Sequence, residues 1–210
     1  MRITIFGATG GTGKHIVQMA LDAGHEVTAF VRSPEKLSID EPNLTVVQGD
    51  VHDAGAVEQA VAGSDAVFSA LANSPKAPTK DVQTVGTQHI IAAMRKHGVT
   101  RLISTTGAGV RFPEDEPGMP DQIIRFLLKT LNGKVLEDAQ RHTDLIVDTD
   151  LEWTIIRAPM LTDGPHTGDY RVGWVGVNTG PRLNRADFAD FVLDVAEDGS
   201  YVHKAPVVSN

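Results

Sequence analysis

The chain has 210 residues, which is enough for one domain with a substantial core. Its 27 acidic and 19 basic side chains give a formal net charge of −8, which disfavours a polyanion-binding surface, so we expect no nucleic-acid partner. The absence of cysteine excludes disulfides and thiolate chemistry. The chain opens directly on a strand-like segment and has no apolar run of membrane-spanning length, so we expect a cytoplasmic protein with no membrane partner.

The first predicted strand, Ile3–Phe6, leads directly into three glycines at Gly7, Gly10 and Gly13. Apolar residues recur at helical spacing after the third glycine and predict a helix over 13–23. A strand, a glycine turn and a helix start in this order are typical of a pyrophosphate site, because the turn lets the backbone approach the anion and the helix presents free N–H groups. The stretch therefore favours a dinucleotide-binding fold over an ordinary glycine-rich turn.

The end of the second predicted strand, Glu26–Val31, indicates which dinucleotide is bound. Folds that bind the non-phosphorylated cofactor usually place Asp or Glu here, where the carboxylate accepts a hydrogen bond from the ribose 2′-OH. This chain has Arg32 and Ser33, with Lys36 nearby, and such donors suit a 2′-phosphate. The alternative is that Arg32 and Lys36 are solvated loop charges. Their position relative to Gly7 favours NADPH as the cofactor.

The third predicted strand, Leu44–Val47, is followed by a second group of candidate cofactor residues. Asp50 stands where a carboxylate can meet the amino group of an adenine, and Val51 where it can cover the adenine face. Asp53 precedes a predicted helix over 54–62 and is expected to cap it.

Strands and helices continue to alternate beyond this point. A fourth strand over 65–71 ends in Ala70, Leu71 and Ala72, whose small or apolar side chains allow a ligand close to the backbone. A loop at 75–79, a helix over 81–97 and a strand over 101–104 follow. The alternation predicts an α/β fold, a Rossmann-like doubly wound parallel sheet with helices on both faces.

The part of the chain after Gly109 has a different character. The acidic segment 112–118 is either a mobile flap or, as is more usual for a run of charges, a solvated excursion. Further elements follow in this order: helices over 123–131 and 134–148 with a break at Asn132 and Gly133, a strand over 152–156, a turn-rich segment over 164–170, a helix over 185–196 capped by Asn184, and a strand over 204–208. We expect a single NAD(P)-binding domain over 1–210, with a small C-terminal substrate-side elaboration and substrate-side elements mainly at 107–135 and 158–184.

The glycine stretch 7–13, with Val31-Arg32 and Gly49-Asp50-Val51 after the next strands, resembles the atypical short-chain dehydrogenases/reductases. Within that group the chain is similar to the NAD(P)H-binding, NmrA-like branch that contains biliverdin reductase B, the NADPH-dependent flavin reductase. The resemblance runs nearly from end to end and extends to Asp65-Ala66-Val67, Ala92-Ala93-Met94 and Thr167-Gly168. The glycine motif is specific for the superfamily, whereas the other matches do not specify a substrate.

The resemblance implies roles for individual positions. In this family NADPH lies across the strand ends and passes hydride directly to flavins or related conjugated acceptors. Arg32, with Ser33, would hold the 2′-phosphate, and Thr105 and Thr106 would lie beside the nicotinamide. The remaining cofactor-binding positions would be Gly7, Thr9, Gly10, Gly11, Thr12 and Gly13 at the pyrophosphate, Asp50 and Val51 at the adenine, and Ala70, Leu71 and Ala72 at the ribose.

Two departures from the family pattern concern catalysis. The flavin reductase has a serine and a histidine at its substrate site, and the matching positions here are Gly107 and Met160. The Tyr-x-x-x-Lys acid/base pair of ordinary short-chain dehydrogenases is absent too, which counts against alcohol/ketone chemistry. The candidate catalytic residues are therefore Thr105, Thr106, His166 and Tyr170, with His142 as a further possible proton donor.

These observations lead to a first hypothesis, an NADPH-dependent oxidoreductase that transfers hydride to a flavin, a quinone or a similar conjugated acceptor. The alternative is a non-catalytic, NADP(H)-binding redox-sensing regulator of the NmrA-like kind. An epimerase or dehydratase acting on a nucleotide-linked substrate is a third and weaker possibility. We expect no metal site, a small-molecule acceptor as the main partner, and a monomer or weak dimer.

Overall fold

The computed structural model describes residues 1–73, 79 and 81–210. The predicted loop at 75–79 lies, except for Thr79, outside these residues. The strands are β1 (Arg2–Phe6), β2 (Glu26–Val31), β3 (Leu44–Gln48), β4 (Ala66–Ser69), β5 (Arg101–Gly107), β6 (Glu152–Ala158), β7 (Met160–Thr162), β8 (Arg171–Gly173), β9 (Arg182–Asn184) and β10 (Val207–Ser209). The helices are α1 (Gly11–Asp22), α2 (Ala54–Val61), α3 (Val82–His97), α4 (Met119–Val147) and α5 (Arg185–Asp198), with a short 3-10 turn η1 (Pro34–Lys36).

Eight strands form one sheet in the order β3-β2-β1-β4-β5-β6-β10-β8, and β7 pairs with β9 in a small second sheet. All pairs in the large sheet are parallel except β10 with β8, at the edge. The strand order runs outward from β1 in one direction and from β4 in the other, so the crevice beside their carboxyl ends is the topological switch point. The predicted Rossmann-like α/β class is confirmed.

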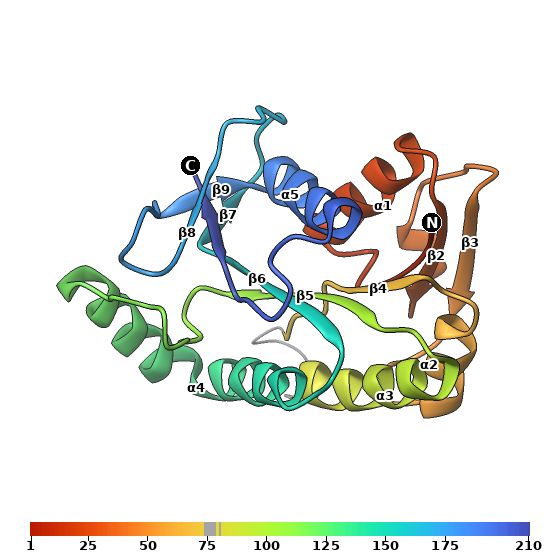
Figure 1. The fold of residues 1–210 in the computed structure, drawn as a ribbon, viewed down its shortest axis with the longest axis horizontal. Helices are drawn as coiled ribbons and strands as arrows, with labels where there is room; N and C mark the ends of the chain where they lie inside the picture. Colours follow the sequence, from red (N-terminus) through yellow and green to blue (C-terminus); the bar gives the residue numbers. More distant parts are fainter. Residues whose placement is uncertain (74–78, 80) are drawn as a thin grey trace.

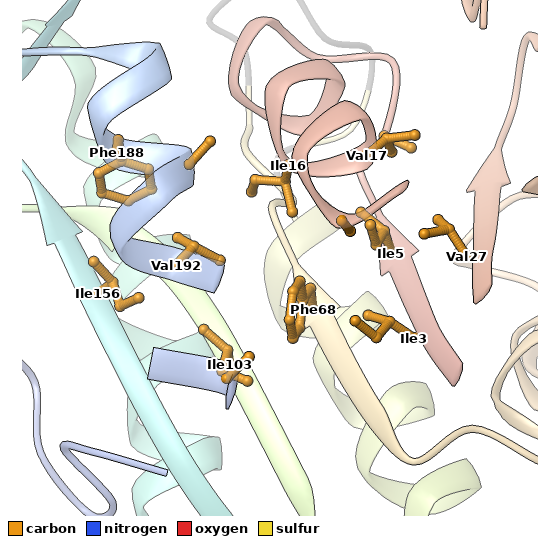
Figure 2. Close-up of a cluster of buried hydrophobic side chains, with 14 of the residues drawn as sticks. Ile3, Ile5, Ile16, Val17, Val27, Phe68, Ile103, Ile156, Phe188 and Val192 are labelled. Atoms are coloured by element: carbon orange, nitrogen blue, oxygen red, sulfur yellow. The ribbon is translucent and has the colours of Figure 1, made fainter. Parts of the chain in front are cut away.

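Helices cover both faces of the sheet (Figure 1). Helices α1 and α5 lie on one face and α2, α3 and α4 on the other. Ile16 and Val17 of α1 and Phe188 and Val192 of α5 point onto the strands, as Figure 2 shows, and are buried there. A second apolar cluster beneath α2, α3 and α4 completes the core, with Phe68 belonging to the first cluster. Both faces being buried explains why the central strands are almost uniformly apolar.

The predicted elements agree with the observed ones, with differences at their ends. Helix α1 begins two residues earlier than predicted, and β5 extends through Thr105 and Thr106 to Gly107. The predicted cap of α2 is confirmed, because the Asp53 carboxylate accepts hydrogen bonds from the N–H groups of Gly55 and Ala56. The last strand is shifted towards the C-terminus, at 207–209 instead of 204–208.

One predicted helix cap is wrong, and one predicted helix break is confirmed as a kink. Asn184 stands at the N-cap position of α5 but its side chain does not cap the helix, because its amide donates to the Pro165 carbonyl at 3.2 Å. The two helices predicted over 123–131 and 134–148 form the single helix α4. The predicted break is present as a kink within α4. It lies at Asn132, whose backbone angles (φ −137°, ψ 37°) are not helical.

Candidate active site

The glycine turn after β1 has a geometric reason for each of its three glycines. Gly7 has a φ of +80°, which favours glycine, and its carbonyl accepts from the N–H of Gly10 at 2.9 Å. A Cβ on Gly13 would lie 2.1 Å from that carbonyl oxygen, so a side chain there would push α1 away from the turn. Gly10 provides no side chain to cap α1, which leaves the first-turn N–H groups facing the crevice for an anion.

Two adjoining cavities lie at the carboxyl ends of the strands. The nucleotide cavity, of about 210 Å³, runs between the glycine turn and the ends of β2 and β3. The acceptor-side cavity, of about 400 Å³, lies between β5, β6 and α4. Ala70, Leu71 and Ala72 line both cavities and join them, as expected for small or apolar residues at the end of β4.

Most of the predicted cofactor residues line one of these cavities. Those in the nucleotide cavity are Gly7, Thr9, Gly10, Arg32, Asp50 and Val51, and those in the acceptor-side cavity are Thr12, Thr105 and Thr106. Gly11, Gly13 and Ser33 line neither. Gly13 acts through close packing, and Gly11 is the first residue of α1.

The ends of β2 and β3 bring a cation and an anion to the nucleotide cavity. Arg32 is exposed there, and no acidic residue occupies its position. The Asp50 carboxylate accepts hydrogen bonds from the backbone N–H and the ring Nδ1 of His52, at 2.9 and 2.6 Å. These hydrogen bonds lower the pKa of Asp50, and in return Asp50 raises the pKa of His52. His52 lines the cavity and was not predicted, since only its contact with Asp50 brings it to the site.

The acceptor-side cavity is mostly apolar. Its apolar lining is Leu71, Val110, Leu128, Val135, Leu136, Ala139, Pro159, Leu161 and Phe188, with small residues between them. Its polar lining is Thr12, Asn73, Gln83, Thr105, Thr106, Asn132 and Arg185. Within the described part of the chain, no carboxylate, imidazole, phenol or ammonium group lines it. A conjugated ring suits this chemistry better than a carbonyl that needs a proton donor.

Thr105 and Thr106 lie at the carboxyl end of β5, just before its last residue, Gly107. The Thr105 hydroxyl donates to the Ser69 carbonyl at 3.3 Å, which joins β5 to β4 at the rim of the cavity. The Thr106 hydroxyl is buried and has no hydrogen-bond partner among the described residues. A buried hydroxyl without a partner is costly unless a ligand or water meets it. Thr105 and Thr106 both line the acceptor-side cavity.

His166 and Tyr170 lie elsewhere, and neither lines either cavity. The Tyr170 hydroxyl donates to Asp190 and Asp194 of α5, both at 3.2 Å, and His166 Nε2 lies 3.2 Å from Asp190. Burial and these two carboxylates raise the pKa of Tyr170, which makes it a poor proton donor. Neither side chain lines the acceptor-side cavity, because carboxylates of α5 hold both of them away from it.

His142 is also remote from the cavities. It is buried between α3 and α4, and its Nδ1 is 2.9 Å from the Thr87 hydroxyl, while Nε2 has no partner among the described residues. Burial lowers its pKa to about 4. His142 is therefore a neutral, packed residue at pH 7 and not a proton donor to the site. Of the two positions that depart from the family pattern, Gly107 lines the acceptor-side cavity, whereas Met160 does not and is exposed.

A buried ion pair that sequence reasoning missed holds the rim of the acceptor-side cavity. The Arg157 guanidinium, at the end of β6, donates to both oxygens of Asp115 at 2.8 Å, and the two side chains are 0% and 2% exposed. Arg157 also donates to the carbonyls of Val110 and Ala205 and packs against the ring of Phe112. Segment 112–118 is thus anchored, and the prediction of a solvated excursion or mobile flap is wrong for its centre.

A signal for this pair existed in the sequence. An arginine at the end of the apolar run of β6 indicates a buried guanidinium, and a carboxylate partner offsets part of the cost of burying such a charge. Burial opposes ionisation of Asp115, but hydrogen bonds from Arg157 and from the N–H groups of Phe112 and Val175 outweigh it and lower the pKa of Asp115. The pattern could therefore have indicated a partner in an acidic loop, but not which carboxylate.

A second missed contact fixes the start of α3. Asp138 of α4 is buried and accepts hydrogen bonds from the N–H groups of Gln83 and Thr84, both at 3.0 Å, and from the Thr84 hydroxyl at 2.6 Å. It also accepts from the Asn73 amide at 3.2 Å. Asp81 stands at the N-cap but its side chain makes no capping bond. A carboxylate from another helix thus caps α3 and positions Gln83 and Asn73 on the acceptor-side cavity.

Arg185, the first residue of α5, is a further residue that the sequence did not reveal. It lines the acceptor-side cavity, and its side chain lies over the start of α1, where a Cβ on Gly11 would be 2.9 Å from its Nε. Its carboxylate partner is Asp163, which is largely exposed. A cation therefore stands beside the N-terminus of α1, where the positive end of the helix already favours an anion.

Comparison with known proteins agrees with this geometry. The model of a family described as NAD(P)H-binding matches residues 7–199. The chain belongs to this family. It is 30% identical to the uncharacterized protein YwnB of Bacillus subtilis, over 94% of this chain and 92% of that one. Several other relatives are longer proteins, of which this chain covers between 32% and 63%.

Solved structures show the same fold over the whole chain. A short-chain dehydrogenase/reductase from Veillonella parvula in complex with NADP has a TM-score of 0.83 at 19% identity and covers all of this chain and 94% of its own. ChuY, an anaerobillin reductase from Escherichia coli O157:H7, has a TM-score of 0.79 at 20% identity, covering all of this chain and 97% of its own. The protein is thus a member of an NAD(P)H-binding family with a Rossmann fold.

The described residues include neither a membrane-spanning helix nor a metal-binding group of side chains. None of their helices combines the length and the hydropathy needed to cross a bilayer. Nor do their His, Asp and Glu side chains form a group of three that could hold a metal ion.

Proposed function

We propose that the protein is an NADPH-dependent reductase that transfers hydride to a flavin, a quinone or a similar conjugated acceptor. The carrying observation is the apolar acceptor-side cavity, which joins the nucleotide cavity through Ala70, Leu71 and Ala72 and has no acid/base side chain in its described lining. Reductases among the relatives and structural neighbours agree with the general class.

The chemistry of such an acceptor fits this lining. Bound NADPH would supply a hydride, which carries two electrons and one hydrogen, and would itself be oxidised to NADP⁺. A conjugated acceptor delocalises the added electron pair, and the reduced acceptor then takes one proton from water. The protein's part is to hold the two rings face to face and keep water away from the hydride. No side chain has to donate a proton at the moment of transfer.

The nucleotide cavity supports NADPH as the hydride donor. Arg32 would hold the 2′-phosphate, with Ser33 beside it, and Asp50, Val51 and His52 would bound the adenine. The preference for a phosphate follows from the charge and donor geometry of a guanidinium where a carboxylate would favour a free 2′-OH.

The glycine turn and α1 would bind the pyrophosphate, with Arg185 supplying a positive charge from α5. Thr105 and Thr106 would contact the nicotinamide at the junction with the acceptor. A hydroxyl such as that of Thr106, buried and unpartnered among the described residues, would gain a partner in the carboxamide.

Turnover assays test the proposal directly. NADPH oxidation is measured with FMN, riboflavin and menadione in turn, and NADPH affinity is measured separately by titration. We expect turnover with at least one acceptor. Tight NADPH binding without turnover of any of them would overturn the proposal.

A cavity-blocking variant sharpens this test. Leu128→Trp fills the acceptor-side cavity from its partly exposed rim, while the control Val46→Trp adds the same bulk to an exposed site on β3. We expect Leu128→Trp to raise the KM for the acceptor and leave NADPH affinity unchanged. Equal kinetics for the two variants would show that the acceptor binds elsewhere.

The second candidate function is a non-catalytic NADP(H)-dependent regulator. It is favoured by Gly107 and Met160, which stand where the flavin reductase has its serine and histidine. If the protein is such a regulator, we expect it to bind NADPH without turnover. We also expect a protein partner whose affinity for this protein differs between the NADP⁺-bound and NADPH-bound states. A pull-down performed with each cofactor in turn distinguishes it from the reductase.

A further inference from the structure

The first part of α4, residues 119–131, exposes more apolar surface than any other segment that the structure describes. We refer to it as the α4 arm. None of its residues is buried. Its large exposed apolar side chains are Met119, Ile123, Ile124, Phe126, Leu127, Leu128 and Leu131. Such a concentration marks a binding surface, because soluble proteins rarely expose large contiguous apolar patches.

Polar contacts fix the arm to the rim of the acceptor-side cavity. Arg125 donates to the Gly109 carbonyl at 3.2 Å, and Arg111 donates to the Asp121 carbonyl at 3.4 Å. A short helix has little stability of its own in water, so the arm depends on these contacts and on its continuation into the packed part of α4. The apolar side chains contribute little to this anchoring and remain available to a ligand.

One face of the arm continues the lining of the cavity. Ile124, Leu127, Leu128 and Leu131 are spaced three and four residues apart and therefore lie along one face of the helix. Leu128 lines the cavity, and a Cβ on Gly109 would lie 3.2 Å from its Cδ1. Beyond the kink, Val135 and Leu136 line the cavity as well. An apolar track thus leads from the interior of the cavity onto the surface of the arm.

We propose that this track binds an aliphatic tail, so that the acceptor is a conjugated ring bearing a long alkyl or isoprenoid chain, such as a prenylated quinone. The proposal rests on the reductase function and narrows its substrate. The ring occupies the cavity, whose volume of about 400 Å³ is that of a small-ligand site, and the tail leaves it along Leu128, Leu127 and Leu131.

The tail is a better occupant of the track than a second copy of the chain. Each copy carries a formal charge of −8, which opposes self-association. The track is also continuous with the cavity, which a dimer contact would not require. In the reaction, one quinone, one NADPH and one proton give one hydroquinone and one NADP⁺; hydride supplies the electron pair and one hydrogen, and water supplies the proton.

The test compares two quinones that share a ring and differ in the tail: decylubiquinone and the analogue with one isoprenoid unit. Each methylene buried on the arm strengthens binding by about fourfold, so we expect kcat/KM to favour decylubiquinone by about tenfold or more. The double variant Leu127→Ser/Leu131→Ser should bring this preference close to one without changing kcat/KM for the short-tailed quinone. Both leucines are at least half exposed, so the fold should tolerate the change.

Phe126→Ser is the matched control. Phe126 is as exposed as Leu131 (68% against 75%) and lies on the same helix, but nearly opposite Leu128. We expect it to keep the preference for decylubiquinone.

Three outcomes would overturn the proposal. The wild type could show no preference for decylubiquinone, Phe126→Ser could lose as much of that preference as the double variant, or sedimentation could show a dimer that Leu131→Ser dissociates. Turnover of short-tailed quinones without a preference would overturn this inference alone, whereas no turnover with any quinone or flavin would overturn the reductase function too.

Discussion

The two sides of the crevice are built on different principles. On the nucleotide side, the candidate residues follow directly from the ends of consecutive strands, and the glycine turn forms through contacts within one short stretch of chain. On the acceptor side, the rim depends on contacts between distant segments, such as Arg157 with Asp115 and Asp138 with the start of α3. The residues of the nucleotide side can therefore be predicted from local sequence motifs, whereas those of the acceptor side cannot.

The difference also has an energetic consequence. A backbone turn tolerates many side chains as long as its glycines are kept, whereas a buried ion pair fails when either partner is removed. Substitutions in the buried polar contacts of the acceptor side should therefore affect the stability of the whole fold, and those on the nucleotide side should affect mainly cofactor binding. Four predictions, in decreasing order of expected effect, examine this contrast.

The largest effect is expected for Asp115→Ala. It leaves the Arg157 guanidinium buried without its carboxylate, and breaking a buried pair in this way costs about 3–5 kcal/mol. The free energy of unfolding in urea measures the loss. The neighbouring Glu114 is exposed, so Glu114→Ala should change stability by less than about 0.5 kcal/mol. Similar losses in the two variants would show that the pair does not anchor the rim.

The second prediction concerns the pH dependence of stability. His142 has a pKa of about 4 in the folded protein and an ordinary pKa of 6.5 in the unfolded chain, so the unfolded chain takes up the proton first as the pH falls. Stability is unaffected above pH 6.5 and is lost between about pH 6.5 and pH 4, by up to about 3 kcal/mol. The measurement is urea unfolding at several pH values across this window.

His142→Asn should flatten this pH profile. His52→Gln is the control and should shift the profile the other way, because the raised pKa of His52 makes its charged form stabilising as the pH falls. A wild-type profile that is already flat between pH 7 and pH 4 would contradict the assigned state of His142.

The third prediction addresses the nucleotide side. Arg32→Ala removes a charged hydrogen-bond partner of the 2′-phosphate and should weaken NADPH binding by about 1.5–3 kcal/mol. NADH affinity should change little, since NADH has no 2′-phosphate. Titration of both cofactors measures the difference, with Lys36→Ala, an exposed cation four residues away, as the control. Equal losses for NADPH and NADH would show that Arg32 does not read the phosphate.

The smallest effects concern two glycines of the same motif. Gly13→Ala places a Cβ 2.1 Å from the Gly7 carbonyl oxygen, which cannot move without opening the turn, and should cost about 1–3 kcal/mol in stability or NADPH binding. In Gly11→Ala the Cβ meets only the Arg185 side chain, which can turn away, so the loss should stay below about 1 kcal/mol. A larger loss in Gly11→Ala than in Gly13→Ala would show that close packing at Gly13 does not explain why the motif has a glycine there.

Much of the architecture could be predicted because it depends on local patterns. Apolar runs predict the buried strands, and the spacing of the glycines predicts the turn. Asp53 caps α2 through hydrogen bonds to residues only two and three positions away in the sequence. The length of α4 could not be predicted in this way. Asn132 and Gly133 have low helix propensity, yet the helix continues past them with only a kink, because packing of its second part overrides the local preference.

The candidate catalytic residues divide along the same line. Thr105 and Thr106 lie at the carboxyl end of β5. Since the carboxyl ends of parallel strands meet at the crevice, their order in the chain implied their position. His166 and Tyr170 lie in a turn-rich segment, whose course depends on what it contacts. Carboxylates of α5 hold both side chains, and nothing in their spacing revealed this.

Local order in the chain was thus sufficient for the Rossmann-like class, the dinucleotide turn and the residues at the ends of β1 to β5, since each of these depends on residues close together in sequence. Only the folded chain decided which polar groups are buried together: Arg157 with Asp115, Asp138 with the start of α3, and Arg185 beside α1. The physical reason is that a buried charge takes whichever partner the packing of helices and loops brings to it. The acceptor cavity is shaped by these partnerships, and the exposed α4 arm, which no described part of the chain covers, extends it to the surface.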